Sequence, residues 1–355
     1  MLHEIVELAS STFGDHAALI ADGRRLTFGE LEARIRHMSA RLGELTEPGD
    51  RVVLIAENRI DAVTALYAVP RAGASLAPAN IRHTPDEVAS FVDSIAPTVV
   101  LATPTQLDLV GEALTGLDRD LEVLSIGGEH AAAKLDLTAA LDDDATAEAE
   151  GSTEHAQPMH VATDPRVCAW IIHTSGTTGR PRAAMLTHGS LAAAVVNTAI
   201  ARPMADDDVY LFPFPLFHVA AYNVLHAHLR RRPVVLIPRF EPAAFMRTVQ
   251  DEGVTSCSLA PTMVSMLLDH PEFSPAALAG LRQIAYGASS MPGSLLRRVL
   301  EELPEVGLAQ GYGMTELSGN AVFLGPEDHR RAITDAPHLL GAAGKPGPLT
   351  ALRIE

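Results

Sequence analysis

The chain has 355 residues, 47% of them hydrophobic, and a formal net charge of -17 at pH 7. This length and composition suffice for one large hydrophobic core or two medium ones, and we expect two lobes. The acidic balance, without a dense stripe of lysine and arginine, argues against a nucleic-acid-binding surface.

The cysteines and the N-terminal segment indicate the cellular compartment in which the protein is expected. Cys168 and Cys257 are the only two cysteines and each lies in an apolar run, so we expect core residues in a reduced, cytoplasmic protein rather than a disulfide framework. The N-terminal segment carries Glu4 and Glu7 and lacks the basic end and apolar run of a secretory signal. No apolar span approaches the roughly 20 residues of a membrane helix.

The first part of the chain alternates predicted helices and strands. Thr27-Phe28-Gly29-Glu30 fits a capping box that begins a helix, and Thr84-Pro85-Asp86-Glu87 begins another in the same way. Strands are expected over 51–56, 74–78 and 98–102, with a helix over 61–72. This alternation predicts a mostly parallel, doubly wound sheet.

The composition changes between residues 136 and 165 to alanine, acidic and small polar residues. We interpret this segment as an acidic surface linker, and its consecutive aspartates at 142–144 as solvated rather than metal-binding. Alternation then resumes, with strands expected over 209–212, 234–237, 255–259, 283–286 and 307–312. The α/β chain therefore divides into a first subdomain at 1–165 and a second at 166–330, followed by residues 331–355.

The most distinctive segment runs from His173 to Arg182 and follows an apolar stretch at 167–172. Its glycines permit close approach to a ligand, its hydroxyl groups donate hydrogen bonds, and its arginines suit a polyphosphate. Thr187 to Ser190 reads as a helix start, so the order strand, loop, helix is expected to offer backbone amides to an anion. The spacing of the glycines in this segment differs from the G-x-x-x-x-G-K-[ST] pattern of a Walker P-loop.

Two further segments follow predicted strands, at 286–290 and 310–316. Loops at the carboxyl ends of strands converge on one crevice in open α/β sheets, although each segment alone also fits a tight turn. Tyr312 offers a flat face to a nucleobase, Thr315 a hydroxyl to a phosphate, and Glu316 an oxygen ligand to Mg2+. Glu316 also fills the third glycine position of a dinucleotide fingerprint, which argues against a Rossmann dehydrogenase.

Taken in order, these segments, together with Phe214 to His218 and Gly341 to Pro346, resemble the core motifs of the adenylate-forming (AMP-binding) superfamily. Within it they look most like fatty acyl-CoA synthetases, and the resemblance extends to residues 26–31 and 49–58. It implies an N-terminal domain of two doubly wound α/β subdomains, with only the start of the β-barrel subdomain and no C-terminal domain.

The resemblance also implies a reaction and its site. A carboxylic acid, ATP and Mg2+ would give an acyl-adenylate, from which coenzyme A would displace AMP. The implied ATP- and AMP-binding residues are Thr174, Ser175, Gly176, Thr177, Thr178, Gly179, Gly287, Ala288, Ser289, Gln310, Gly311, Tyr312, Gly313, Met314, Thr315 and Glu316. The implied catalytic residues are Thr174, Arg182, Thr315 and Glu316, with Glu316 the metal ligand. The implied acyl pocket comprises His218, Val219, Tyr222 and Gly287.

The sequence departs from the family pattern in two places. Arg182 and Ala183 stand where the family loop has lysine and glycine, which keeps the positive charge but changes its reach and the freedom of the backbone. The aspartate for the ribose hydroxyls, the hinge and the small domain with its lysine would all follow Glu355. We therefore expect an N-terminal fragment, ending in a strand-like stretch at 349–355 and deficient in turnover.

The residues after His218 indicate the type of acid. Amino-acid-activating relatives have an aspartate where this chain has apolar residues from Val219 to Ala221, and an unpaired ammonium there would be costly. We therefore expect a plain carboxylic acid with an aliphatic or aryl tail, with a fatty acid favoured. Two alternatives stay open: an acyl-AMP ligase that loads a carrier protein, and a non-catalytic nucleotide- or acyl-binding module. A homodimer also stays open.

Two other patterns are weaker. His226 and His228 lack further partners at metal-ligand spacing, so we expect packing or surface roles for both. Ser289 and Ser290 lack the glycine-flanked elbow of a serine hydrolase.

Overall fold

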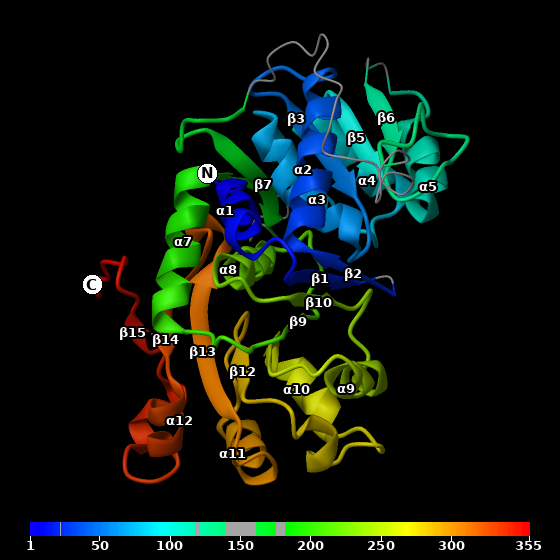
Figure 1. Cartoon of the computed structure of the whole chain (residues 1–355). Coiled ribbons are helices and arrows are strands. Elements are labelled where there is room, and N and C mark those ends of the chain that lie inside the picture. The colour runs from blue at the N-terminus through cyan, green and yellow to red at the C-terminus, as the bar shows by residue number, and fades with distance from the viewer. Residues whose placement is uncertain (22, 118, 120, 139–160, 175–181) are drawn as a thin grey trace. The chain divides into compact units, whose positions relative to one another are not determined.

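The computed structural model describes residues 1–21, 23–117, 119, 121–138, 161–174 and 182–355 (Figure 1). The chain forms two compact units. The first unit comprises Met1–His16, Leu26–Gly189 and Leu216–His218, and the second comprises Ala17–Arg25, Ser190–Pro215 and Val219–Glu355. Each unit is described by itself below.

The first unit contains a six-stranded sheet of order β6-β5-β3-β4-β7-β8. The five strands from β6 to β7 pair in parallel, and β8 is antiparallel to β7. The strands are β3 (Arg51–Ile55), β4 (Ser75–Pro78), β5 (Val99–Ala102), β6 (Glu122–Ser125), β7 (Cys168–Thr174) and β8 (Arg182–Thr187). The predicted parallel, doubly wound sheet is confirmed, because helices connect β3 to β4, β4 to β5 and β5 to β6.

The helices of this unit begin where local hydrogen bonds cap them. Thr27 Oγ1 accepts from the Glu30 amide at 3.2 Å, while the Glu30 carboxylate accepts from the Thr27 amide at 2.7 Å. Thr84 and Glu87 form the same box, so both predicted helix starts are confirmed. The helices are α1 (Glu4–Phe13), α2 (Phe28–Gly43), α3 (Ile60–Arg71), α4 (Pro85–Ile95) and α5 (Pro104–Leu114). Apolar faces of α4 and α5 share one core with β3 and β5.

The second unit contains a nine-stranded sheet of order β15-β14-β13-β12-β11-β9-β10-β1-β2. The pairs from β13 through β12, β11, β9 and β10 to β1 are parallel, and β14 pairs antiparallel with both β13 and β15. The strands are β1 (Ala17–Ala21), β2 (Arg24–Thr27), β9 (Tyr210–Phe212), β10 (Val234–Leu236), β11 (Ser256–Leu259), β12 (Gln283–Tyr286), β13 (Gly307–Met314), β14 (Gly319–Leu324) and β15 (Lys345–Pro346).

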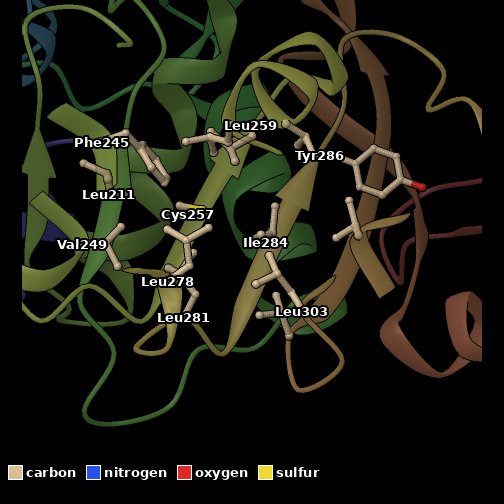
Figure 2. Close-up of a cluster of buried hydrophobic side chains, with 14 of the residues drawn as sticks. Leu211, Phe245, Val249, Cys257, Leu259, Leu278, Leu281, Ile284, Tyr286 and Leu303 are labelled. Carbon is tan, nitrogen blue, oxygen red and sulfur yellow. The ribbon is translucent and has the colours of Figure 1, made fainter. Parts of the chain in front are cut away.

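A large apolar core supports this second sheet. Figure 2 shows Leu211, Cys257 and Ile284, from the adjacent strands β9, β11 and β12, packed with Phe245 of α9. Burial of such side chains is the main stabilising term, at about 25 cal/mol per Å² of apolar surface. The helices are α7 (His188–Ala201), α8 (Tyr222–Leu229), α9 (Pro242–Asp251), α10 (Pro261–Leu268), α11 (Gly293–Glu302) and α12 (Pro326–Ala332). Short 3-10 turns are η1 (Val219–Ala221), η2 (Pro275–Leu278), η3 (Thr315–Leu317) and η4 (Pro337–Gly341).

The strand expected over 307–312 is present and continues to Met314, because the backbone there pairs with β14. A second expectation about a strand is wrong. The stretch from Leu349 to Glu355 is exposed and not a strand, since no strand among the described residues provides it with a hydrogen-bonded neighbour.

No described helix combines the length and apolar character needed to span a membrane.

Candidate functional site

The predicted phosphate-binding segment lies between β7 and β8 of the first unit. Thr174 ends β7 opposite Arg182 at the start of β8, and the Thr174 hydroxyl donates to the Arg182 carbonyl at 3.4 Å. The Arg182 side chain is exposed. Ser175, Gly176, Thr177, Thr178 and Gly179 lie outside the described residues.

The expected order of strand, loop and helix in this segment is wrong. A second strand, β8, stands between the loop and α7, and it pairs antiparallel with β7. The pattern of glycines and hydroxyl residues is equally compatible with a hairpin connection and with a loop before a helix. Any amides presented to a ligand here therefore belong to a hairpin connection and not to the first turn of α7.

His173 precedes Thr174 and lies half-buried against an aromatic ring. Its ring centroid is 4.4 Å from that of Phe91. Burial, and to a smaller degree the neighbouring His83, lower the pKa of His173, so its imidazole is neutral at pH 7. His218, predicted for the acyl pocket, is also part of the first unit and is exposed.

The turn after β12 touches β13 in the second unit. A Cβ on Gly287 would lie 2.6 Å from the carbonyl oxygen of Gly311, closer than any side chain tolerates. The next residue, Ala288, has φ of +68°, a left-handed conformation that costs a non-glycine residue energy. Ser289 is exposed beside them. The structure therefore brings together two of the segments predicted for the nucleotide.

The β13–β14 hairpin carries the rest of the predicted nucleotide residues. Side chains on Gly311 or Gly313 would overlap Asn320 or the Gly319 carbonyl, so both positions require glycine. The ladder changes register between Tyr312 and Gly313, a bulge of the kind that redirects side chains. Tyr312 is 56% exposed and Met314, on the same side of the strand, is 54% exposed. The Tyr312 ring is thus open to a planar ligand.

The turn that follows β13 holds Thr315 and Glu316. Ser318 closes this turn with φ of +62°, and its hydroxyl donates to Ser190 Oγ at 2.9 Å. The Glu316 carboxylate is exposed, and no group of three or more histidine, cysteine or acidic residues that could hold a metal occurs among the described residues. A single carboxylate fits Mg2+, which binds proteins through one or two carboxylates together with phosphates and water.

Tyr222 links the predicted acyl pocket to this hairpin. It is 2% exposed, and its phenol oxygen accepts from Thr198 Oγ1 at 3.3 Å. A Cβ on Gly319 would lie 2.9 Å from the Tyr222 ring. Burial raises the pKa of Tyr222, so the phenol stays neutral. Val219 lies in η1, just before α8, and is also buried.

Tyr286 makes a second contact that no sequence pattern indicated. Its hydroxyl lies 3.1 Å from Gln310 Oε1 and 2.8 Å from His329 Nε2, and His329 Nδ1 donates to the Gly325 carbonyl at 2.7 Å. Burial raises the pKa of Tyr286 and lowers that of His329. The neutral His329 ring therefore accepts at Nε2 from the Tyr286 hydroxyl, which lies beside Gln310. No sequence pattern indicated the role of His329, because only the packing of α12 brings this residue to Tyr286.

A buried polar cluster surrounds Arg202, which follows α7. The guanidinium donates to Ser258 Oγ at 3.2 Å and to Asn223 Oδ1 at 2.7 Å, and it lies 3.2 Å from His226 Nδ1. Nearby, His228 Nε2 lies 3.0 Å from the Ala18 carbonyl. His226 and His228 are buried, which agrees with the packing roles expected for them. Arg202 had no sequence signal.

Comparison with protein families matches residues 6–355 to the description "AMP-binding enzyme". A feruloyl-CoA synthase of an Amycolatopsis species is 32% identical over 351 residues, which cover 96% of this chain and 63% of that protein. The long-chain-fatty-acid–CoA ligase of Thermus thermophilus is 30% identical, over 99% of this chain and 64% of that protein. The chain thus spans less than two thirds of the length of these curated relatives.

Solved structures show the same fold. The N-terminal domain of FACL13 from Mycobacterium tuberculosis superposes with a TM-score of 0.80 at 21% identity, covering 98% of this chain and 82% of that one. The o-succinylbenzoate CoA synthetase of Bacillus subtilis superposes with a TM-score of 0.78 at 22% identity, over 97% of this chain and 64% of that one. The predicted fold class, the N-terminal α/β domain of an adenylate-forming enzyme, is confirmed.

Proposed function

The chain belongs to the AMP-binding enzyme family, within the adenylate-forming acid-CoA ligases, and from this premise we propose that the whole protein activates a carboxylic acid with ATP. The acid carboxylate attacks the α-phosphate, which gives acyl-AMP and releases pyrophosphate. The thiol of coenzyme A then attacks the acyl carbon and displaces AMP, which gives the thioester.

One observation carries this proposal most directly. Gly287 and Gly311 approach so closely that no side chain fits between them. This contact joins the turn at 287–289 to the strand that bears Tyr312 and leads to Glu316. Separate predicted segments thereby become one surface of the second unit, with an open aromatic ring and an open carboxylate.

The chemistry requires control of charge more than an added acid or base. The attacking carboxylate and the triphosphate are both negative, so hydrogen-bond donors must offset their repulsion and stabilise the charge of the transition state. We propose that Tyr312 stacks on adenine, that Thr315 donates to the α-phosphate, and that Gln310, which lies beside Tyr286, also contacts the nucleotide. Mg2+, when bound, would neutralise phosphate charge, with Glu316 as its protein ligand.

We propose that the triphosphate end is bound by the hairpin of the first unit. Thr174 and Arg182 flank the segment 175–179, and their donors suit β- and γ-phosphate oxygens. Arg182 brings a planar fork of donors, which binds a phosphate through two oxygens rather than through a point charge. Arg182 therefore keeps the positive charge of the family's lysine, and its donor groups have a different geometry. Ala183 replaces the glycine that follows.

For the acid, we propose a plain carboxylic acid with an apolar body, a fatty acid in the first instance. Val219 and Tyr222 provide buried apolar surface on the second unit, and we also propose His218, on the first unit, as an acyl-binding residue. Coenzyme A is the proposed acceptor, and the cytoplasm is the proposed compartment because both cysteines are free thiols. We propose residues 331–355 as the beginning of a β-rich subdomain. A homodimer remains open.

The test is trapping of acyl-AMP with hydroxylamine by the whole protein, across a panel of carboxylic acids. Acid-dependent hydroxamate is expected, and Glu316→Gln is expected to lower its rate by about 100-fold, within the range of a lost transition-state contact. Glu305→Gln is a matched control, because Glu305 is also exposed and lies before β13. Absence of hydroxamate and of pyrophosphate release with every acid would contradict the proposal.

The 355-residue chain alone gives a second measurement. Because the relatives are longer than this chain, we expect it to bind AMP weakly while forming scarcely any acyl-CoA. Rapid thioester formation by the isolated chain would overturn this expectation.

A further inference from the structure

The guanidinium of Arg202 is buried without a counter-ion. Its side chain belongs to a residue that is only 6% exposed, and arginine stays charged in a protein interior. No carboxylate among the described residues lies within ion-pair distance of it. Its partners are the neutral groups of Ser258, Asn223 and His226. An isolated buried charge is costly unless a counter-charge compensates it.

The hydrogen bonds of Arg202 all run to neutral groups. Nη1 donates to Ser258 Oγ, and Nη2 donates to Asn223 Oδ1 and lies beside His226 Nδ1. None of these partners compensates the charge of the guanidinium.

His226 next to Arg202 leaves a buried donor without an acceptor. Its Nδ1 faces an arginine N–H, which can only donate, so Nδ1 accepts. The neutral ring then carries its proton on Nε2, and Nε2 is buried with no hydrogen-bond partner. Burial and the charges of Arg202 and Arg230 lower the pKa of His226, which keeps the ring neutral. This buried donor therefore points to an acceptor outside the described residues.

The region is positive although the chain as a whole is acidic. Half-buried Arg230 also acts on His226, and its side chain donates to the Met204 carbonyl at 3.4 Å. Neither Arg230 nor Arg202 forms an ion pair within the described part of the chain. A net charge of -17 offers many carboxylates, so two arginines without one mark a place suited to an external anion.

This cluster adjoins the wall proposed for the acyl group. Tyr222 bonds to Thr198, and the Arg202 amide donates to the Thr198 carbonyl at 2.7 Å. On α8, Tyr222 and His226 are four residues apart and so lie on one face of the helix. An acyl chain that passes Val219 and Tyr222 would next meet His226 and Arg202.

We propose that Arg202 and His226 bind a second carboxylate at the distal end of the acyl substrate, so that the acid activated is a dicarboxylic acid. This inference rests on the proposed function and narrows its substrate class. The distal carboxylate accepts a hydrogen bond from His226 Nε2, and its charge compensates the guanidinium of Arg202. The proximal carboxylate remains the one that attacks ATP.

The experiment uses the whole protein and a ladder of straight-chain α,ω-dicarboxylic acids, each matched to the monocarboxylic acid of the same length. Hydroxamate formation gives kcat/KM for each acid. For the best length, we expect the diacid to exceed its monoacid by about tenfold or more, the size of a charge-assisted hydrogen bond. Arg202→Met should abolish this preference mainly by lowering kcat/KM for the diacid, because the diacid alone carries the carboxylate that Arg202 is proposed to bind.

A conservative variant and a binding measurement complete the design. Arg202→Lys keeps the charge but loses the fork, so we expect it to retain part of the preference. Calorimetric titration of the wild-type protein with the diacid and with its monoacid reports the same preference without turnover. This wild-type comparison decides the question even if Arg202→Met does not fold.

The outcomes separate this inference from the proposed function. Equal kcat/KM and equal binding of diacids and monoacids at every length would overturn the distal-carboxylate site and leave acid activation intact. Arg202-dependent diacid binding without hydroxamate from any acid would support the site and contradict the proposed activity. An equal loss on both acid series in folded Arg202→Met would show a structural role for Arg202 and overturn the inference.

Discussion

Arg34 in the first unit and Arg202 in the second are buried to nearly the same degree, at 5% and 6% exposure. Arg34 Nη2 lies 2.9 Å from Asp61 Oδ1, so its charge is compensated within the chain. Arg202 has only neutral partners. The difference indicates that the first arginine serves the fold, whereas the second leaves a positive charge available to a ligand.

The largest expected effect comes from breaking the compensated pair. Asp61→Asn leaves the Arg34 charge buried and uncompensated, which should lower the free energy of unfolding of the first unit by about 3–5 kcal/mol. The single tryptophan, Trp170, is buried in this unit and donates to the Leu66 carbonyl, so its fluorescence follows unfolding in urea.

The exposed pair of Arg119 and Asp93, in the same unit, is the matched control. These side chains are 35% and 65% exposed, and Asp93→Asn should cost less than about 1 kcal/mol. Equal costs for the two substitutions would show that burial of the Arg34 pair does not matter.

A buried histidine extends this comparison of buried basic groups, because histidine can become neutral by losing a proton and arginine cannot. Burial lowers the pKa of His228 from 6.5 to about 4. The unfolded chain therefore takes up a proton that the folded chain does not between these pH values, so the free energy of unfolding falls as the pH drops from about 6.5 to 4. His228→Gln should remove up to about 3 kcal/mol of this decline.

Circular dichroism during urea unfolding at several pH values measures that decline for the second unit. His338→Gln is the control, because it makes the same substitution at an exposed histidine. A decline of the same steepness in the His228 variant would contradict the account of its burial.

Arg202→Met should cost less stability than Asp61→Asn. The substitution removes the uncompensated charge together with its hydrogen bonds, and the partners left unpaired are neutral, so we expect a loss of about 1–2 kcal/mol. Circular dichroism during thermal unfolding measures it. A loss as large as that of Asp61→Asn would indicate that Arg202 is compensated within the protein.

Tyr286 and Tyr312 lie in the segments proposed for the nucleotide, and they too compare a buried side chain with an exposed one. The expected effects are smaller. Tyr286 is buried and bonded to His329, whereas Tyr312 is 56% exposed. Tyr312→Ala should weaken AMP binding by about tenfold, the size of a lost base–aromatic stack, and change stability by less than about 0.5 kcal/mol. Titration with a fluorescent AMP analogue measures the affinity. Unchanged affinity would remove Tyr312 from the adenine site.

Local signals in the sequence predicted local structure. The capping boxes at Thr27 and Thr84 depend on residues three positions apart, and both form as predicted. The sequence did not predict the strand β8, because β8 depends on pairing with β7, and the glycine-rich motif stands between the two strands. The extension of β13 to Met314 likewise depends on a partner, β14, that no single segment reveals.

The candidate site likewise has residues that the sequence indicated and residues that only the folded structure shows. Glycine spacing pointed to Gly287 and Gly311, and their contact confirms that these two segments meet. Arg202, His226 and Ser258 are far apart in the sequence, and only the fold buries them together without a carboxylate. Counter-ion status is a property of tertiary packing, so composition and periodicity could not show it.

The most direct measurement is acid-dependent ATP–pyrophosphate exchange by the whole protein, with a dicarboxylic acid and its length-matched monocarboxylic acid. The account predicts faster exchange with the diacid at limiting concentration, and loss of that advantage in Arg202→Met, mainly through slower exchange with the diacid. Equal exchange with both acids in the wild-type protein would contradict it.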